Sequence, residues 1–212
     1  MTAPSLVLYV DAQYASPYAM SAFVSLHEKG LSFNMKTVDL GAGENLLPAF
    51  ARTSLTCRVP TLVHGDFRLS ESSAISEYLD EVFPDAGIRL YPGDSRKRAR
   101  ARQVQAWLRS DMLALRRERS TEVVFYGRTA AALSAQARAA ADKLCAAAGA
   151  LLEDDDGYIC GDWCIADVDL ALMLNRLVLH GDEVPPRLVA YAHRQWARPS
   201  VRMWIAQQRP PL

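Results

Sequence analysis

The pattern of hydrophobic and polar residues changes once along the chain, close to residue 84. Before this point, short apolar runs alternate with segments of helical spacing, which predicts the order strand, helix, strand, helix, strand, strand, helix. After it, apolar residues recur only at helical spacing. The pattern therefore predicts an α/β domain over residues 1–84, a linker over 85–97 and an all-helical domain over 98–212.

In the first domain, the ends of the first helix are marked by residues that start or stop helices. Ser16 and Pro17 suit the N-cap and the first helical position, and Gly30 suits the helix end. A second Pro, Pro60, is expected to begin a short strand. The predicted strands are residues 5–10, 31–40, 60–62 and 67–69, and the predicted helices are residues 17–29, 46–51 and 71–83.

The second domain is predicted to contain five helices. A long amphipathic helix comes first, and an alanine-rich helix over 134–152 is stopped by the acidic residues 154–156. The helix expected over 164–181 is apolar nearly all round, as the centre of a helical domain should be. Two more helices are expected over 188–196 and 199–207. The apolar positions that define the long first helix are Val104, Trp107, Leu108, Met112 and Leu115.

Composition and charge are those of an ordinary globular protein. Half of the 212 residues are apolar and 23% are charged, and Lys plus Arg equals Asp plus Glu at 24 each. A nucleic-acid or membrane-surface binder is therefore not expected, and no apolar run has the length of a membrane span. Residues 1–4 do not begin a secretion signal, and the four cysteines form no CxxC pair. We therefore expect a cytoplasmic protein with reduced thiols.

The candidate ligand-binding residues come at the start of a strand and at the start of the helix that follows. An X-Pro bond at an ordered strand end is where a cis peptide is most plausible, and a cis Val59-Pro60 bond would turn the Val59 backbone toward a ligand. Glu71 and Ser72 begin the helix, whose free N–H groups attract a carboxylate. One ligand with a peptide-like backbone and a carboxylate would satisfy both places.

Several of these sequence motifs, in this order, resemble those of a known family. Ser16-Pro17-Tyr18 lies at the first helix, Val59-Pro60 before the third strand and Glu71-Ser72 at the third helix. Residues 161–167 resemble the family's helix-capping segment. In these features the chain resembles the cytosolic glutathione S-transferases of the bacterial, serine type. The resemblance implies a thioredoxin-like N-terminal domain, an all-helical C-terminal domain, a homodimer and glutathione as co-substrate.

The resemblance makes Ser16 the candidate catalytic residue. Its hydroxyl would donate a hydrogen bond to the glutathione sulfur, whose thiol has a pKa of ~8.5 in water. Such a bond contributes roughly 1.5–3 kcal/mol, or about one to two pKa units, in favour of the thiolate. The alternative is that Ser16 is only an N-cap, and the two roles are compatible. Other branches of the family use a tyrosine, so Tyr14 is a rival that could line the pocket, whereas Tyr9 is expected in the core.

The resemblance also assigns the contacts to the rest of glutathione. Glu71 would bind the ammonium of the γ-glutamyl end and Ser72 its carboxylate, with helix capping by the acid as the alternative. Val59 and Pro60 would present the backbone edge. Arg58 either meets the glycine carboxylate or is a solvated side chain. The preceding loop lacks the family's usual Asn-Pro pair, which leaves the contacts to the glycine end poorly assigned.

A second departure from the family lies at the capping segment. Cys164 stands where the family commonly has Ser or Thr, and a thiol is a poor acceptor for an N-cap. Asp167 is therefore expected to carry more of the capping by reaching back to backbone N–H groups. On this basis, Asp167→Ala is expected to lower stability by roughly 1 kcal/mol.

The predicted activity is glutathione transfer. The enzyme would activate glutathione as a thiolate for conjugation to a small electrophile, as in detoxification, or for reduction of an organic hydroperoxide. A serine at the first helix argues against thiol–disulfide exchange, which needs a protein thiol there. The alternatives are a glutathione-dependent isomerase and a non-catalytic binding or regulatory protein with the same fold. No metal is expected, because residues 154–156 beside Cys160 and Cys164 are more typical of a solvated loop and the four histidines are scattered.

Overall fold

The computed structural model describes residues 5–152 and 157–212. The first four residues and the expected helix stop at residues 154–156 lie outside this description. The chain divides into two compact units. One contains the residues up to Leu90 together with Met203–Leu212, and the other contains Tyr91–Arg202.

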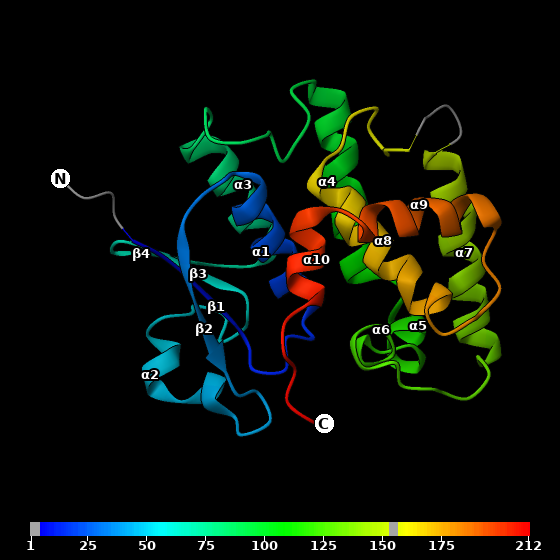
Figure 1. Ribbon diagram of the computed structural model, residues 1–212, viewed down its shortest axis with the longest axis horizontal. Coiled ribbons are helices and arrows are strands. Elements are labelled where there is room, and N and C mark those ends of the chain that lie inside the picture. The colour runs from blue at the N-terminus through cyan, green and yellow to red at the C-terminus, as the bar shows by residue number, and fades with distance from the viewer. Residues whose placement is uncertain (1–4, 153–156) are drawn as a thin grey trace. The chain divides into compact units, whose positions relative to one another are not determined.

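The first unit is built on a four-stranded mixed sheet with the strand order β2-β1-β3-β4 (Figure 1). Strand β1 pairs in parallel with β2 and antiparallel with β3, and β3 pairs antiparallel with β4. This is the predicted thioredoxin-like arrangement. The strands are β1 (Leu6–Asp11), β2 (Phe33–Val38), β3 (Thr61–His64) and β4 (Phe67–Ser70).

Two helices of the first unit, α1 (Pro17–Glu28) and α3 (Ser72–Val82), pack against each other. Every residue of α1 from Ala19 to Leu26 is buried, and the Ser25 and Ser76 hydroxyls meet across the helix pair at 2.8 Å. The connection between β2 and β3 contains the short helices η1 (Glu44–Leu46) and α2 (Pro48–Ala51), the second close to the helix predicted over 46–51. The predicted strands and helices of this unit are confirmed to within a few residues.

The second unit is helical throughout the part of it that the structure describes, apart from its connecting segments. The central helix α8 is buried along almost its whole length and contacts α4, α6, α7 and α9, as its apolar sequence predicts. None of the helices in the described residues has the length and apolar character to cross a membrane. The helices are α4 (Ser95–Ser110), α5 (Leu113–Glu118), α6 (Thr121–Tyr126), α7 (Ala135–Leu151), α8 (Ile165–Val178), α9 (Pro186–Trp196) and α10 (Pro199–Ile205), the last of which spans the boundary between the units.

The prediction of one continuous helix from Val104 to Leu115 is wrong. The helix ends at Ser110, and Met112 takes a left-handed backbone conformation with φ of 61°. The cause is Asp111, whose carboxylate accepts the backbone N–H of Met112 at 2.8 Å and the indole N–H of Trp107 at 3.0 Å. These bonds give the backbone an alternative to another helical turn, and the apolar residues beyond it belong to a separate helix, α5.

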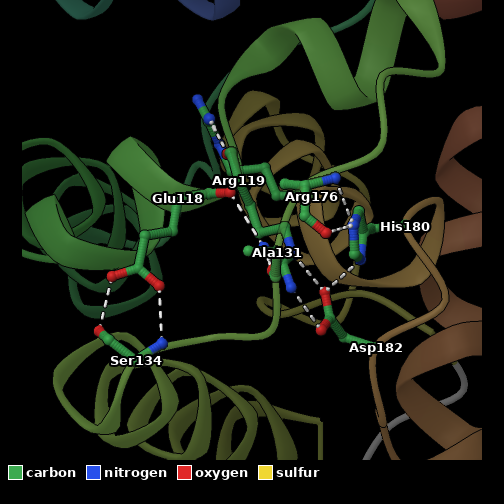
Figure 2. Close-up of polar contacts among 8 residues, drawn as sticks. Glu118, Arg119, Ala131, Ser134, Arg176, His180 and Asp182 are labelled. Atoms are coloured by element: carbon green, nitrogen blue, oxygen red, sulfur yellow. Dashed lines mark hydrogen bonds and ion pairs between the residues drawn. The ribbon is translucent and has the colours of Figure 1, made fainter.

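A buried ion pair holds the end of α5 against the segment that follows α8 (Figure 2). Arg119, 1% exposed, donates to both carboxylate oxygens of Asp182 at 2.6 and 2.9 Å and to the Ala131 carbonyl at 2.9 Å. Arg176, from α8, donates to the Arg119 carbonyl at 2.6 Å. The Arg119 hydrogen bonds lower the pKa of Asp182.

The start of α8 is capped as predicted by Asp167. Its Oδ2 accepts the backbone N–H of Cys164 at 2.9 Å, and its Oδ1 accepts the N–H of Ile159 at 3.0 Å and the Tyr191 hydroxyl at 2.9 Å. Burial raises the pKa of this carboxyl to about 6, although the hydrogen bonds favour its ionised form. Asp167 therefore joins the cap of α8 to the preceding loop and to α9.

Candidate functional site

The register of the sheet gathers the predicted site residues of the first unit at one edge. Tyr9 lies opposite Thr61, and Thr61 lies opposite Ser70, so these three residues form one row across β1, β3 and β4. Because β3 is antiparallel to both of its neighbours, the end of β1, the start of β3 and the end of β4 leave the sheet on the same side. Neighbouring strands are about 4.8 Å apart, so the outer members of this row are separated by about 10 Å.

Ser16 follows β1 in the chain, at the edge of the sheet where this row lies, and is the N-cap of α1. Its backbone is extended, with φ of −70° and ψ of 118°, and its Oγ accepts the N–H of Ala19 at 3.2 Å. Pro17 occupies the first turn, as predicted. The capping bond uses the hydroxyl as an acceptor, so the hydroxyl proton is left for another partner.

Asp11, the last residue of β1, holds the loop that carries Ser16. Its Oδ2 accepts the N–H of Ala15 at 2.6 Å and its Oδ1 accepts the N–H of Ser16 at 3.1 Å. The side chain is buried, and desolvation raises its pKa, while these hydrogen bonds and the charge of Arg209 act in the opposite direction. The predicted first strand ends at residue 10, and sequence reasoning missed this role of Asp11; the available signal was an acid immediately after an apolar strand.

Tyr14 is fixed in the same loop by the C-terminal residues of the unit. Its backbone has φ of 49°, and its carbonyl accepts a hydrogen bond from Arg209 at 3.2 Å. Its ring packs edge-on against Trp204, with centroids 5.8 Å apart. Trp204 is fully buried and also contacts Phe23 of α1. The ring of Tyr14 therefore belongs at least partly to a packing cluster.

The second part of the site is the segment before β3. The Val59-Pro60 peptide bond is cis, as predicted, and Val59 is buried beside Val38 and Phe50. Among the hydrogen bonds of the described residues, none uses the N–H or carbonyl of Val59. The Arg58 side chain is exposed.

Two buried hydroxyls that sequence reasoning missed hold this segment. Ser54 Oγ accepts the N–H of Arg58 at 3.3 Å and lies 2.8 Å from the Thr61 hydroxyl. Thr61 Oγ1 also lies 2.8 Å from the Arg58 carbonyl. No motif in the sequence marks these two residues, because their pairing depends on the loop closing back on the start of β3.

The third part is the junction of β4 and α3. Glu71 is exposed and adopts φ of 73° and ψ of 115°, an unfavourable conformation for a residue with a side chain. Ser72 follows as the first residue of α3 and is buried. A non-glycine residue held in such a conformation costs on the order of 1–3 kcal/mol and is found most often at functional sites.

The chemistry available at this edge comes from two helix starts. Helix α1 begins after β1 and helix α3 after β4, and both strand ends lie at the same side of the sheet. The N-terminus of a helix favours a negative charge, so one anion beside Ser16 and a second beside Ser72 would both be stabilised. Within the described residues, no three His, Cys, Asp or Glu side chains gather as ligands for a metal.

Comparison with known families identifies this arrangement. Residues 15–82 match the model of the glutathione S-transferase N-terminal domain, and residues 94–209 match that of the glutathione S-transferase C-terminal domain. The chain belongs to the glutathione S-transferase family. The family of the sequence-based resemblance is thereby confirmed, together with its fold.

Relatives of known name match parts of the chain. Glutathione S-transferase 1 of Dianthus caryophyllus is 47% identical over 76 residues, which are 36% of this chain and 34% of that protein. Glutathione S-transferase theta-1 of Mus musculus is 38% identical over 104 residues, 48% of this chain and 41% of that protein. These matches span well under two thirds of the lengths of the relatives.

Solved structures of the family match over nearly the whole chain. A glutathione transferase homologue from Burkholderia GL BGR1, solved with bound glutathione, is 49% identical and superposes with a TM-score of 0.76 over 95% of this chain and 96% of that one. Maleylacetoacetate isomerase from Methylobacterium extorquens AM1, solved with malonate and glutathione, is 25% identical with a TM-score of 0.71, over 93% of this chain and 95% of that one.

Proposed function

We propose that this protein is a glutathione transferase that binds glutathione at the sheet edge of its first unit and activates the bound thiol with Ser16. The observation that carries the proposal is the row Tyr9, Thr61, Ser70, because it brings the segments with Ser16, Val59-Pro60 and Glu71-Ser72 to one side of the sheet. The homologue with bound glutathione supports the choice of ligand.

Each end of glutathione has a chemical match in the segments next to this row. The γ-glutamyl carboxylate suits the N–H groups at the start of α3 beside Ser72, and the γ-glutamyl ammonium suits the exposed Glu71 carboxylate. The cysteinyl backbone suits the N–H and carbonyl of Val59. Arg58, exposed next to Val59, is proposed for the glycine carboxylate, and Tyr14 for the wall beside the sulfur.

The capping and catalytic roles of Ser16 are compatible. Its oxygen accepts the Ala19 N–H, and its proton donates to the glutathione sulfur. The donated bond and the start of α1 both lower the pKa of the thiol, which increases the thiolate fraction at neutral pH. The thiolate then attacks a small electrophile and displaces its leaving group. With an organic hydroperoxide it attacks one peroxide oxygen, the O–O bond breaks and the alcohol leaves, and a second glutathione converts the resulting sulfenic acid to glutathione disulfide and water.

A glutathione-dependent isomerisation is the second candidate, because the solved maleylacetoacetate isomerase resembles this chain over nearly its whole length. In that reaction the same thiolate adds to the substrate and is later expelled. A non-catalytic glutathione-binding protein is the remaining alternative. Turnover of an electrophile, a hydroperoxide and a cis-enone diacid, each measured with glutathione, separates these three functions.

Calorimetric titration with glutathione tests the binding site. Glu71→Ala is expected to weaken binding, because it removes the partner of the ligand ammonium. Glu81→Ala, which removes an exposed carboxylate from the far end of the same helix, is the matched control and should bind as the wild type does. The absence of binding heat with the wild-type protein, or equal affinity of all three proteins, would refute the proposed site.

Absorbance titration of the bound thiolate tests the role of Ser16. Ser16→Ala is expected to raise the pKa of bound glutathione by about one to two units. Ser134→Ala is the control for the loss of a cap, since Ser134 Oγ accepts the Ala137 N–H at 3.2 Å at the start of α7. Identical thiol titrations in Ser16→Ala and the wild type would assign Ser16 to capping alone.

We also propose that the protein is a cytoplasmic homodimer. The segment before β3 exposes three leucines, Leu46 at 72%, Leu47 at 54% and Leu55 at 95%, which supports a self-association surface there. Light scattering should give the mass of a dimer for the wild type and of a monomer for Leu55→Asp. Leu113→Asp, at a position of the second unit that is 50% exposed, is the control and should leave the mass unchanged. A monomeric wild type would refute the dimer.

A further inference from the structure

An amide side chain from the connection between β2 and β3 holds the segment that leads to the cis Val59-Pro60 bond. Asn45, in the short helix η1, donates from Nδ2 to the Cys57 carbonyl at 2.9 Å. Asn45 is half-buried, and the two residues are 12 positions apart in the chain. Their hydrogen bond therefore ties η1 to the backbone just ahead of Val59.

Asn45 is itself carried by a turn that closes on the end of β2. The backbone N–H of Glu44 donates to the Asp39 carbonyl at 3.0 Å, and Glu44 Oε2 accepts the Asp39 N–H at 2.8 Å. Asp39 Oδ1 in turn accepts the N–H of Ala42 at 2.9 Å. Because these bonds hold η1 against the residue that directly follows β2, the Asn45 amide acts from a fixed support.

The peptide group between Cys57 and Arg58 is bound at both of its polar atoms. Its carbonyl oxygen accepts the Asn45 amide, and its N–H donates to Ser54 Oγ at 3.3 Å. A peptide group is planar and its N–H and carbonyl point in opposite directions, so two such bonds oppose its rotation. Cys57 needs this restraint, since its φ of 52° is uncommon for a residue with a side chain.

The next peptide group, between Arg58 and Val59, is bound on one side. Its carbonyl lies 2.8 Å from the Thr61 hydroxyl, whereas its N–H, on Val59, has no partner among the hydrogen bonds of the described residues. The Val59 N–H and carbonyl are the groups proposed above for the cysteinyl backbone of glutathione. Their direction depends on the preceding peptide group, which Asn45 holds.

We propose that Asn45 is a positioning residue for glutathione. Its amide orients the Val59 backbone through the peptide group between Cys57 and Arg58, and it acts on the ligand through that backbone and not by direct contact. This inference rests on the glutathione site proposed above. Loss of the Asn45 amide should therefore weaken binding of the cysteinyl part of the ligand and leave thiol activation by Ser16 unchanged.

Calorimetry with two ligands tests the route by which Asn45 acts. Asn45→Ala is expected to weaken glutathione binding roughly three- to tenfold, the effect of one hydrogen bond. γ-Glutamylcysteine, which lacks the glycine, should lose the same factor, because Val59 would meet the part that both ligands share. Asn34→Ala, which removes an exposed amide from β2, is the control and should bind both ligands as the wild type does.

Two results of this titration would overturn the proposal. A loss of affinity confined to glutathione would show that Asn45 touches the glycine end directly. Unchanged affinity of Asn45→Ala for both ligands would show that the hydrogen bond has no effect on the site. Asn45→Asp, which has nearly the same shape but no amide donor, should also bind more weakly than the wild type, and wild-type affinity in this variant would contradict the proposal as well.

Turnover separates positioning from catalysis. In Asn45→Ala the KM for glutathione should rise by the factor found in calorimetry, with kcat at saturating glutathione and the pKa of the bound thiol unchanged. The reason is that Ser16 is held by a separate hydrogen bond to Asp11. A lower kcat or a shifted thiol pKa with an unchanged KM would overturn the positioning role.

Amide hydrogen exchange of the ligand-free protein tests the restraint without glutathione. The Arg58 N–H should exchange roughly three- to tenfold faster in Asn45→Ala than in the wild type or Asn34→Ala, because its peptide group can then rotate away from Ser54. Equal exchange in all three proteins would overturn the proposal. If the wild type bound no glutathione while Asn45→Ala still exchanged faster, the proposed ligand would be wrong and the positioning contact would stand.

Discussion

Asp11 accepts the backbone N–H of Ser16 through Oδ1 at 3.1 Å, and thereby ties the proposed catalytic residue to the end of the central strand. The second oxygen accepts the N–H of Ala15 at 2.6 Å. A buried carboxylate with two backbone partners is rigid, because each bond restricts the other. The orientation of the Ser16 side chain is therefore set by β1 and not by the loop alone.

Removing this carboxylate should change both stability and thiol activation. Asp11→Ala leaves two N–H groups without their acceptor, and we expect a loss of about 2 kcal/mol in the free energy of unfolding, measured in urea. The pKa of bound glutathione should rise as well, because Ser16 is no longer held in place. In a Ser16→Ala background, Asp11→Ala should not change the thiol pKa further; an additional rise would show that Asp11 acts by another route.

The strained backbone of Glu71 gives a prediction that separates stability from binding. Glycine tolerates a positive φ, so Glu71→Gly should be about 1 kcal/mol more stable than Glu71→Ala, although glycine usually costs stability elsewhere. Both variants should lose glutathione affinity to the same degree, since both lack the carboxylate. Denaturant melts and calorimetry measure the two effects. Equal stability of the two variants would mean that the local backbone relaxes without cost.

Asp167 should contribute more to stability than a helix cap alone. Its carboxylate accepts hydrogen bonds from Cys164, Ile159 and Tyr191. Asp167→Ala leaves the two buried backbone N–H groups without a partner and leaves the Tyr191 hydroxyl only the backbone carbonyl of residue 167, at 3.3 Å. We expect a loss of about 3 kcal/mol, compared with roughly 1 kcal/mol for a cap. Asp162→Ala, at an exposed position of the same turn, should be close to neutral. A loss of about 1 kcal/mol or less would restrict the role of Asp167 to capping.

The raised pKa of Asp167 predicts a pH dependence of stability. A carboxyl with a pKa of about 6 in the folded state and ~3.9 in the unfolded state binds its proton more tightly when folded. The contribution of Asp167 to the free energy of unfolding is therefore greatest at low pH. It falls by about 2–3 kcal/mol in total as the pH rises from about 4 through about 6. Asp167→Asn should remove this slope from urea melts. A difference between wild type and variant that is constant over this range would contradict the raised pKa.

The buried pair of Arg119 and Asp182 should be costly to break from one side. Arg119→Met removes the bidentate partner of the Asp182 carboxylate, whose side chain is 8% exposed. We expect the free energy of unfolding to fall by about 3–5 kcal/mol. The free energy of unfolding should fall clearly less in the double variant Arg119→Met with Asp182→Leu, because neither charge of the pair remains. Equal losses in the single and double variants would show that packing, and not charge, explains the effect.

Several features of the site could be predicted from neighbouring residues in the sequence. Ser16 followed by Pro17 is a helix start whose partners lie within one turn, and the structure shows that cap. The cis bond before Pro60 and the hydrogen bond from the Cys164 N–H to Asp167 likewise involve residues close together in the sequence. The helix break at Asp111 was missed, although the donors to its carboxylate lie within one turn, because apolar periodicity continues through it into α5.

The sequence by itself determined the family, the strand and helix order of the first unit and the residues proposed to bind glutathione, because these depend on local motifs and apolar periodicity. Only the tertiary structure decided which residues hold the site in place. Arg209 reaches the Tyr14 carbonyl across 195 positions of the chain, and the Cys160 thiol donates to the backbone carbonyl of Lys97 in α4 across 63 positions. Such pairings depend on how the helices and strands pack. Neighbouring residues in the sequence do not indicate which distant group a polar or charged side chain will contact.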